Sequence, residues 1–377
     1  MNMPKAFMGV NKFALDTPCL VIDKDKLDYN LKLMQQHADA NGINLRPHCK
    51  THKCSQLAKL QRQYGAIGIS AAKISEAEVL INQGITGLLI TSPLVSTYKI
   101  RRLLNCLKKS PDTILVVDNE KNIAELATAA ASINQKINVL LDLDPGIGRT
   151  GVKPELALPL ATAIMNSQWL NFLGVQCYAG NLQHIISYQQ RQESSLQAMQ
   201  QASEVVQTLK KAGLPCPILT GTGTGTYDID SVAAEITEIQ PGSYAVMDVD
   251  YARIGSKENP HQFTTFQHAM TLLTTVISSN RQEHVTVDAG TKALYFDPVN
   301  KPKIISHPHL NYDWGGFGDE HGKITAPNKA PLPANKEVLE LIVPHCDPTI
   351  NLFDKFYITS NDIVIDVWDI DARGASQ

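Results

Sequence analysis

The chain has 377 residues, of which 43% are apolar and 19% are charged. This balance is typical of a soluble globular protein and excludes disordered, collagen-like and disulfide-scaffold classes. The net charge of −3 gives no indication of nucleic-acid binding, and no apolar run approaches the ~20 residues of a membrane span. Residues 1–17 lack a continuous apolar stretch, so we expect no secretory signal. Seven cysteines without a C-x-x-C pair predict reduced thiols and a cytoplasmic location.

Short apolar or β-branched runs alternate with longer amphipathic stretches through most of the chain. We predict strands at residues 43–46, 66–70, 87–91, 113–117, 137–143, 172–178, 217–220 and near 236–247. Helices are expected at 53–64, 75–83, 119–133 and 188–211, among others. Asp23 is expected to cap a helix that begins near Lys24, and Pro154 to lie in the first turn of another. Eight strands that alternate with helices predict a (β/α)8 TIM-like barrel, with a doubly wound open sheet as the alternative.

The pattern changes near Pro260. Strands are expected at 270–278, 284–288, 338–343 and 362–367 with no helices between them, and the Pro-, Gly- and His-rich stretch 301–333 is expected to form long loops. The fold class is therefore α/β, with a barrel over residues 18–258 and a C-terminal β domain made of 1–17 and 259–377. The run from Thr17 to Asp23 reads as a strand of either domain.

Ionisable residues follow the first predicted strand directly, in the run Arg46-Pro-His-Cys-Lys-Thr-His-Lys53. The active sites of such barrels lie at the C-terminal ends of the strands. Crowding by like charges and partial burial lower the pKa of a lysine and make its amine able to form a Schiff base. Lys50 is therefore a candidate nucleophile, flanked by His48 and His52; a solvated basic loop is the alternative.

Two later strands also end in residues with useful chemistry. Arg149 follows the fifth strand, held among glycines, where its guanidinium can meet an anionic oxygen. Tyr178 ends the sixth strand and faces the barrel mouth or is a rim aromatic. A Gly-rich turn without function is the alternative for the segment around Arg149.

The seventh strand ends in Thr220-Gly-Thr-Gly-Thr-Gly-Thr226. Backbone N–H groups and hydroxyls in such a run can bind phosphate, and phosphate sites in barrels often follow strands 7 and 8. A flexible polar loop is the alternative. A phosphate site together with a strand-end lysine predicts pyridoxal phosphate, which needs both.

The C-terminal part contributes Pro344-His-Cys-Asp-Pro348. In an extended segment His345 and Asp347 would project to the same side and Cys346 to the other. His345 and Asp347 are therefore candidate ligands of a divalent metal, Zn or Mn, and Cys346 is not counted as a ligand. The polar turn Gly318-Asp-Glu-His-Gly322 would contribute His321 if it approaches the barrel.

Together these motifs resemble the D-threonine aldolase and D-serine dehydratase family, fold-type III pyridoxal phosphate enzymes related to the alanine racemase N-terminal barrel. The similarity also includes Pro241-Gly-Ser-Tyr244 and Met247-Asp248 with Tyr251, and it extends over nearly the whole chain. It implies that Lys50 carries the cofactor and that Arg149 bonds its phenolic oxygen. The other residues implied to hold the cofactor are His48, Tyr178, Gly221, Thr222, Gly223, Thr224 and Tyr244. No residue is identified as the partner of the pyridine nitrogen.

The resemblance implies retro-aldol cleavage of a D-3-hydroxy amino acid to glycine and an aldehyde. The spacing His345-x-Asp347 matches the aldolases, whereas dehydratases typically show His-x-Cys. Lys50, His52 and His321 are the candidate catalytic residues, and the base is His52, His321 or metal-bound water. D-Serine-type dehydration is the first alternative; an amino acid racemase or a non-enzymatic cofactor-binding protein is the second. The resemblance also implies a homodimer with its active site completed at the interface, a small D-amino acid as substrate, and neither nucleic acid nor membrane as partner.

Overall fold

The computed structural model describes residues 7–377 and divides them into two compact units. The barrel unit comprises Leu33–Lys50, Leu57–Gly242 and Gly374–Gln377. The β unit comprises Thr51–Gln56, Ser243–Arg373 and the described part of Met1–Lys32. The domain limits expected at residues 17/18 and 258/259 stay a prediction. None of the helices within residues 7–377 is long and apolar enough to cross a membrane.

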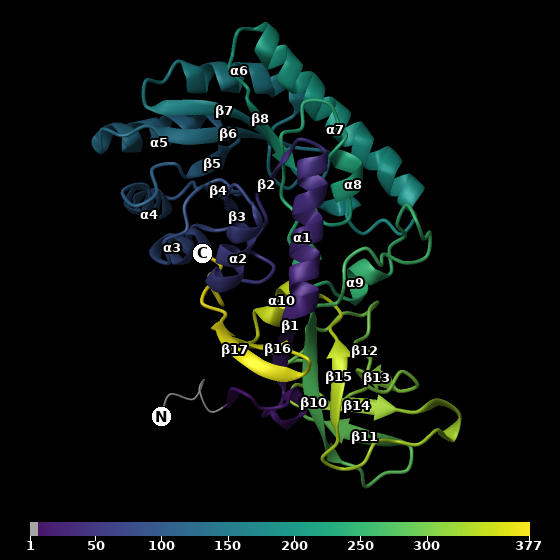
Figure 1. Ribbon diagram of the computed structural model, residues 1–377. Coiled ribbons are helices and arrows are strands. Elements are labelled where there is room, and N and C mark those ends of the chain that lie inside the picture. Colours follow the sequence, from purple (N-terminus) through teal and green to yellow (C-terminus); the bar gives the residue numbers. More distant parts are fainter. Residues whose placement is uncertain (1–6) are drawn as a thin grey trace. The chain divides into compact units, whose positions relative to one another are not determined.

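Eight parallel strands form the sheet of the barrel unit, in the order β2-β9-β8-β7-β6-β5-β4-β3 (Figure 1). They are β2 (Asn44–Leu45), β3 (Ile69–Ala71), β4 (Leu88–Ile90), β5 (Ile114–Val117), β6 (Ile137–Leu143), β7 (Leu170–Cys177), β8 (Ile218–Gly221) and β9 (Glu238–Ile239). A parallel bridge between His48 and Ser70 joins the two outer members of this order and closes the ring. The predicted barrel is confirmed, and the open-sheet alternative is wrong.

Helices follow most of the barrel strands. They are α2 (Ser55–Tyr64), α3 (Ile74–Asn82), α4 (Thr97–Leu107), α5 (Glu120–Ser132), α6 (Pro154–Met165), α7 (Tyr188–Lys211) and the short α8 (Tyr227–Asp230). Pro154 is the first residue of α6, as expected. In α1 (Lys24–Ala40), the Asp23 carboxylate accepts the amides of Asp25 and Lys26, each at 3.1 Å, and caps the helix.

Apolar strand residues fill the interior of the barrel unit, because parallel strands are covered on both faces. Leu89, Ile114, Val116 and Leu140 form one buried cluster. Burying each such side chain contributes about 1.5–3 kcal/mol. The barrel therefore has a packed core, and its chemistry is confined to the strand ends.

The β unit contains a nine-stranded mixed sheet whose main path is β13-β14-β11-β10-β1-β16-β17, with β15 pairing β10 and β12 pairing β15. Its strands are β1 (Cys19–Asp23), β10 (Met270–Ser278), β11 (His284–Val287), β12 (Lys303–Ile304), β13 (Asn311–Asp313), β14 (Gly322–Thr325), β15 (Val338–Ile342), β16 (Lys355–Ser360) and β17 (Ile363–Asp369). Strand β1 lies in the run Thr17 to Asp23, which the sequence alone did not assign to one domain. It pairs antiparallel with β10 and parallel with β16.

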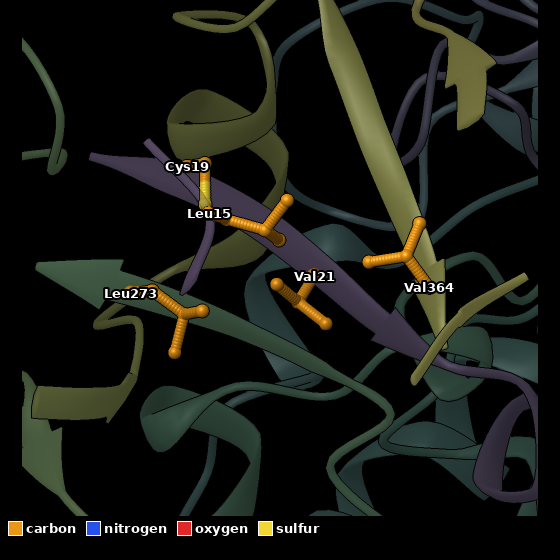
Figure 2. Close-up of a cluster of buried hydrophobic side chains, with 5 residues drawn as sticks. All are labelled: Leu15, Cys19, Val21, Leu273 and Val364. Carbon is orange, nitrogen blue, oxygen red and sulfur yellow. The ribbon is translucent and has the colours of Figure 1, made fainter. Parts of the chain in front are cut away.

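Figure 2 shows the buried cluster beside β1, formed by Leu15, Cys19, Val21, Leu273 and Val364. Leu15 and Cys19 are each 5% exposed, and the other three side chains are exposed by 2% or less. These residues lie far apart in the sequence, so the cluster ties the N-terminal strand to β10 and β17.

Two expectations for the C-terminal part are wrong. Residues 301–333 contain three short strands, β12 to β14, instead of only long loops. No helix was expected between the strands after residue 260, but α10 (Cys346–Ile350) lies between β15 and β16. The unit also contains a second short helix, α9 (Val249–Ala252). The three strands are held by pairing partners elsewhere in the sheet, which the local sequence does not reveal.

Candidate active site

A cavity of about 560 Å³ lies at the C-terminal ends of the barrel strands. Almost every strand contributes lining residues: His48, Lys50, Ala72, Lys73, Thr91, Ser92, Pro93, Val95, Asp118, Arg149, Thr150, Gln176, Tyr178 and Gln240. Its volume is that of an ordinary small-molecule or cofactor site. Four residues singled out from the sequence, His48, Lys50, Arg149 and Tyr178, are thus brought together.

The segment that carries Lys50 is anchored by the residues that precede it. Before it, Arg46 makes a buried two-pronged ion pair with Glu238, with nitrogen–oxygen distances of 2.7 and 2.9 Å, which ties β2 to β9. His48 Nδ1 accepts the amide of Lys50 at 3.3 Å, and its Nε2 lies 3.1 Å from Thr91 Oγ1. Because Nδ1 is an acceptor, Nε2 carries the hydrogen and donates it to Thr91. His48 therefore positions Lys50, and the segment is an ordered part of the cavity wall.

The loop that carries Arg149 is folded back on the end of β6. The Asp144 carboxylate accepts the amides of Gly146 and Gly148, each at 3.0 Å. A bridge between Leu143 and Val152 closes the loop. The Arg149 guanidinium lies 5.4 Å from the centre of the Tyr178 ring, a cation–π distance. This arrangement holds a cation and an aromatic face together in the cavity.

A chain of buried polar groups lies beneath the cavity, and the sequence did not point to it. Gln240 Nε2 donates to Thr220 Oγ1 at 2.9 Å and to Gln176 Oε1 at 3.3 Å. Gln176 Nε2 donates in turn to Asp142 Oδ1 at 2.8 Å. Burial raises the pKa of Asp142 to about 6, although the hydrogen bond from Gln176 opposes this shift. The only sequence signal was a polar residue inside an otherwise apolar strand.

The end of the Gly/Thr run after β8 is hydrogen-bonded to the side chain of Gln183. Gln183 Oε1 accepts the amide of Gly225 at 2.9 Å, and Gln183 Nε2 donates to Thr226 Oγ1 at 3.0 Å. A Cβ atom added at Gly223 would come within 2.4 Å of Gln183 Oε1, and one at Gly221 within 1.9 Å of the Cys177 carbonyl oxygen. Only glycine fits at position 221, where the neighbour is backbone, whereas a side chain at position 223 would require Gln183 to move.

Two buried charged residues, Arg191 and Asp230, also form hydrogen bonds with the end of the Gly/Thr run. The Arg191 side chain is fully buried, and its Nε donates to the Gly225 carbonyl at 2.7 Å. Asp230 accepts hydrogen bonds from Thr226 and Ser195, each at 2.6 Å. Burial raises the pKa of Asp230 to about 6, against the effect of these hydroxyl donors. Residues 221–226 are thus preorganised before any ligand binds.

Three further candidates belong to the β unit. His52 is fully buried, and its Nδ1 accepts the amide of Cys54 at 3.1 Å. Tyr244 is fully buried and packs edge-on against Phe266, with ring centres 5.7 Å apart. His321 is exposed and directly precedes β14. Their predicted roles stay predictions.

A cluster of possible metal-binding groups lies at the start of α10. Ligand atoms of Asp248, His345 and Cys346 lie within 4.8 Å of one another. The segment is extended at His345 but becomes helical at Cys346, so the expectation of an extended His-Cys-Asp segment is wrong. Ser243 Oγ and Cys346 Sγ each lie 3.4 Å from Asp347 Oδ1. The side chain of Cys346 therefore faces Asp347 and is not turned to the opposite side.

The thiol of Cys346 is fully buried beside carboxylates. Burial, together with the negative charges of Asp248 and Asp347, raises the pKa of Cys346 well above its usual value. The other donors at this turn are the imidazole of His345 and the carboxylates of Asp248 and Asp347. Such donors suit Zn²⁺ or Mn²⁺.

Comparison with known proteins agrees with this architecture. Residues 22–250 match the family model of the alanine racemase N-terminal domain, and residues 269–359 match that of a putative serine dehydratase domain. The chain is 36% identical to a D-threonine aldolase from Arthrobacter sp over 99% of its own length and 97% of the relative. It is 34% identical to a 3-hydroxy-D-aspartate aldolase from Paracoccus denitrificans, covering 98% and 95% of the two chains.

Among solved structures, the D-threonine aldolase from Filomicrobium marinum superposes with a TM-score of 0.93 at 33% identity. That match covers 98% of each chain. The architecture, the ordered motifs and the full-length similarity lead to one assignment. This chain belongs to the D-threonine aldolase and D-serine dehydratase family, whose barrel is the alanine racemase N-terminal domain.

Proposed function

We propose that this protein is a lyase that cleaves the Cα–Cβ bond of D-3-hydroxy amino acids such as D-threonine, giving glycine and an aldehyde. The observation that carries the proposal is the strand-end cavity in which Lys50, Arg149 and Tyr178 meet. The full-length similarity to proteins named aldolases supports the reaction class.

The residues of the cavity fit pyridoxal phosphate. Lys50 offers an amine for the aldehyde of the cofactor, and Arg149 offers a guanidinium for its phenolic oxygen. Tyr178 offers an aromatic face. The Gly/Thr run, which is not among the lining residues of the cavity, would offer amides and hydroxyls for the phosphate. When bound, this cofactor supplies an electron sink for the charge that develops at the substrate's α carbon. The chain's own task is to hold the ring and to move protons.

His345 and Asp347 would hold a divalent ion, Mn or Zn. Imidazole and carboxylate are suitable donors for either ion. The ion would supply Lewis acidity to the β-hydroxyl of the substrate and so lower the pKa of that group. Asp347 is also contacted by Ser243 Oγ, which supports the orientation of its carboxylate.

The protein must then remove the β-hydroxyl proton and return a proton to the α carbon. The Lys50 amine, which would hold the cofactor, would also be suited to deliver the second proton to the α carbon. For the first proton the candidates remain His52 and His321. His52 Nδ1 accepts a backbone hydrogen bond, so a proton would be exchanged at its Nε2.

Dehydration is the second candidate, because the C-terminal part matches the putative serine dehydratase domain. In that reaction Lys50 would remove the α proton, and the hydroxyl would leave as water. The same residues serve both reactions, which differ in the bond that is broken. Racemisation and cofactor binding without catalysis are the remaining alternatives.

We further propose that the substrates include D-3-hydroxy amino acids with an acidic side chain. Lys73 lines the cavity in addition to Lys50 and Arg149, so the cavity holds one cation more than the cofactor needs. Such a cation would favour a carboxylate on the substrate side chain, as in 3-hydroxy-D-aspartate. We also propose a homodimer with its active site completed at the interface, and a cytoplasmic location, for which the burial of all seven cysteines is the support.

The test is identification of products from D-threonine and 3-hydroxy-D-aspartate, with pyridoxal phosphate and Mn or Zn added. Glycine with an aldehyde supports the proposal. A 2-oxo acid with ammonia would establish the dehydratase instead, and an L- or allo-isomer would establish an epimerase. Full activity after removal of metal by a chelator would refute the metal role while leaving the cofactor site intact.

A further inference from the structure

Asp248 is a fully buried carboxylate of the β unit, and both of its oxygens are engaged. Its Oδ1 accepts the amide of Tyr251 at 2.8 Å and caps α9. Its Oδ2 accepts the amide of Cys346 at 2.8 Å and lies 2.9 Å from His345 Nδ1. One side chain therefore connects the first turn of α9 to the first turn of α10.

The backbone around Asp248 fixes this connection. The amide of Val249 donates to the Val343 carbonyl, and the amide of Asp250 donates to the Pro344 carbonyl, each at 3.1 Å. Met247, just before Asp248, is fully buried and has a φ of 60°, a left-handed conformation that costs energy for this residue type. The surrounding contacts must therefore hold Asp248 in one place.

A carboxylate at Nδ1 determines which nitrogen of His345 can bind a metal. With Asp248 as the acceptor, Nδ1 carries the hydrogen and Nε2 presents its lone pair. Metal-binding histidines are ordinarily held in this way by a carboxylate or carbonyl, which fixes the ring and raises its basicity. We infer that Asp248 is a positioning residue that directs His345 Nε2 to the metal and itself lies outside the coordination sphere, with Asp347 as the second ligand of the proposed function.

The donors around Asp248 argue against direct coordination by its own carboxylate. Two backbone amides, those of Tyr251 and Cys346, point their positive ends at its two oxygens. A cation bound there would face these amides at close range and lose both hydrogen bonds. The Cys346 thiol already contacts Asp347 Oδ1 at 3.4 Å. The inference rests on the proposed function for the presence of a metal, but not for the reaction.

The first experiment measures Mn²⁺ affinity by the loss of the free-ion electron paramagnetic resonance signal, using the full-length protein with its cofactor. Asp248→Asn should weaken binding by about 10- to 100-fold, the usual effect of losing such a partner. Activity should return when excess Mn²⁺ is added, because both ligands remain. Asp250→Asn is the matched control: it removes a neighbouring charge of α9 whose carboxylate binds Asn300 and Arg253.

Wild-type affinity in Asp248→Asn would overturn the inference. An equal loss in Asp250→Asn would also overturn it, because the effect would then come from charge alone. Absence of Mn²⁺ binding by the wild-type protein would overturn it together with the metal role. Binding that responds to Asp248→Asn, in a protein that does not cleave D-3-hydroxy amino acids, would support it while refuting the aldolase.

The second experiment needs no variant and covers the case in which Asp248→Asn does not fold. Nitrogen-15 histidine spectra of the zinc-loaded wild-type protein report the tautomer of His345. We expect a hydrogen on Nδ1, shifted downfield by the carboxylate, and a metal-shifted Nε2. Coordination through Nδ1 would overturn the inference. His345→Ala assigns the signal by its disappearance.

Discussion

The cavity of the barrel unit and the metal cluster of the β unit are built in opposite ways. Nearly every barrel strand gives one or two side chains to the cavity, so its groups lie far apart in the sequence and have separate supports. The proposed ligands of the β unit, His345 and Asp347, are neighbours in one turn, and the Asp248 carboxylate contacts that turn at the His345 ring and at the Cys346 amide. Substitution of one cavity residue should therefore remove only the contribution of that residue, whereas a substitution in the turn should affect the whole metal site.

Lys50→Ala removes the amine that is proposed to bind the cofactor. Without this amine the cofactor cannot be held covalently, so the visible absorption of the bound cofactor should be lost. Activity should fall by about 10³-fold or more, since nucleophile and proton donor are removed together. Metal content, measured by elemental analysis, should not change. An unaltered visible spectrum would show that another lysine carries the cofactor.

Asp347→Asn tests metal binding by the turn at the start of α10. The amide retains an oxygen that accepts from Ser243 and Cys346, but it loses the charge that binds a cation. We expect metal content to fall and activity to decrease by about 10²-fold, the scale of losing Lewis-acid assistance. The cofactor spectrum should stay as in the wild type. Loss of cofactor and metal together would contradict the separation of the two sites.

Periodicity in the sequence was sufficient for the barrel. The predicted limits of β6, α7 and β10 agree with the structure residue for residue, because each is a continuous run bounded by turn residues. Strands β12 to β14 were missed, since two to four residues within a Pro- and Gly-rich stretch become strands only through their partners. The family resemblance is confirmed by the comparisons.

The sequence also pointed to the residues at the strand ends but not to those that support them. Lys50, Arg149 and Tyr178 stand out because each lies in the segment that follows a strand, and the structure places them in one cavity. Gln183 holds the Gly/Thr run from 42 residues away, and Asp248 holds His345 from 97 residues away. Contacts of this kind have no local signature. The helical turn at Cys346 was missed for a related reason: its five residues are too short for periodicity to show.

Gly223→Val tests whether the Gly/Thr run of the barrel unit binds the phosphate of the cofactor. The added side chain would collide with Gln183 and displace the amides of the run. We expect cofactor affinity, measured by spectral titration, to fall about 10-fold, with a stability loss of about 1–3 kcal/mol. Gly84→Val is the control, since its φ of 80° strains the backbone but no atom lies within 4 Å of its Cβ. It should lower stability without weakening cofactor binding. Equal loss of cofactor in both variants would contradict the assignment of the phosphate site.

Asp142 gives a prediction on the pH dependence of stability. Burial raises its pKa in the folded protein to about 6, above the usual 3.8 of an aspartate, so folding favours the protonated form. The stability that this group contributes is present below about pH 4 and is lost as pH rises through about 6. Asp142→Asn keeps the oxygen that accepts from Gln176 and should make the protein more stable near pH 7, by on the order of 1–3 kcal/mol.

Denaturant unfolding from about pH 4 to about pH 7 measures this effect. The difference between Asp142→Asn and wild type should grow with pH. Asp39→Asn, an exposed acid on α1, is the control and should give a curve parallel to that of the wild type. A constant difference between Asp142→Asn and wild type across the range would mean that Asp142 titrates normally.

The smallest expected effect concerns Lys73, which lines the cavity but is exposed to solvent. An exposed charge contributes at most about 1 kcal/mol, so Lys73→Met should lower kcat/KM for an acidic substrate by about 2- to 5-fold. Activity on D-threonine should not change, because its side chain carries no charge. Added salt should weaken the preference of the wild type and leave that of the variant constant. Lys121→Met removes an exposed charge at the start of α5, outside the cavity lining, and should behave as wild type. An equal loss on both substrates would mean that Lys73 supports the cavity wall, and the acidic preference would then have to come from elsewhere in the site.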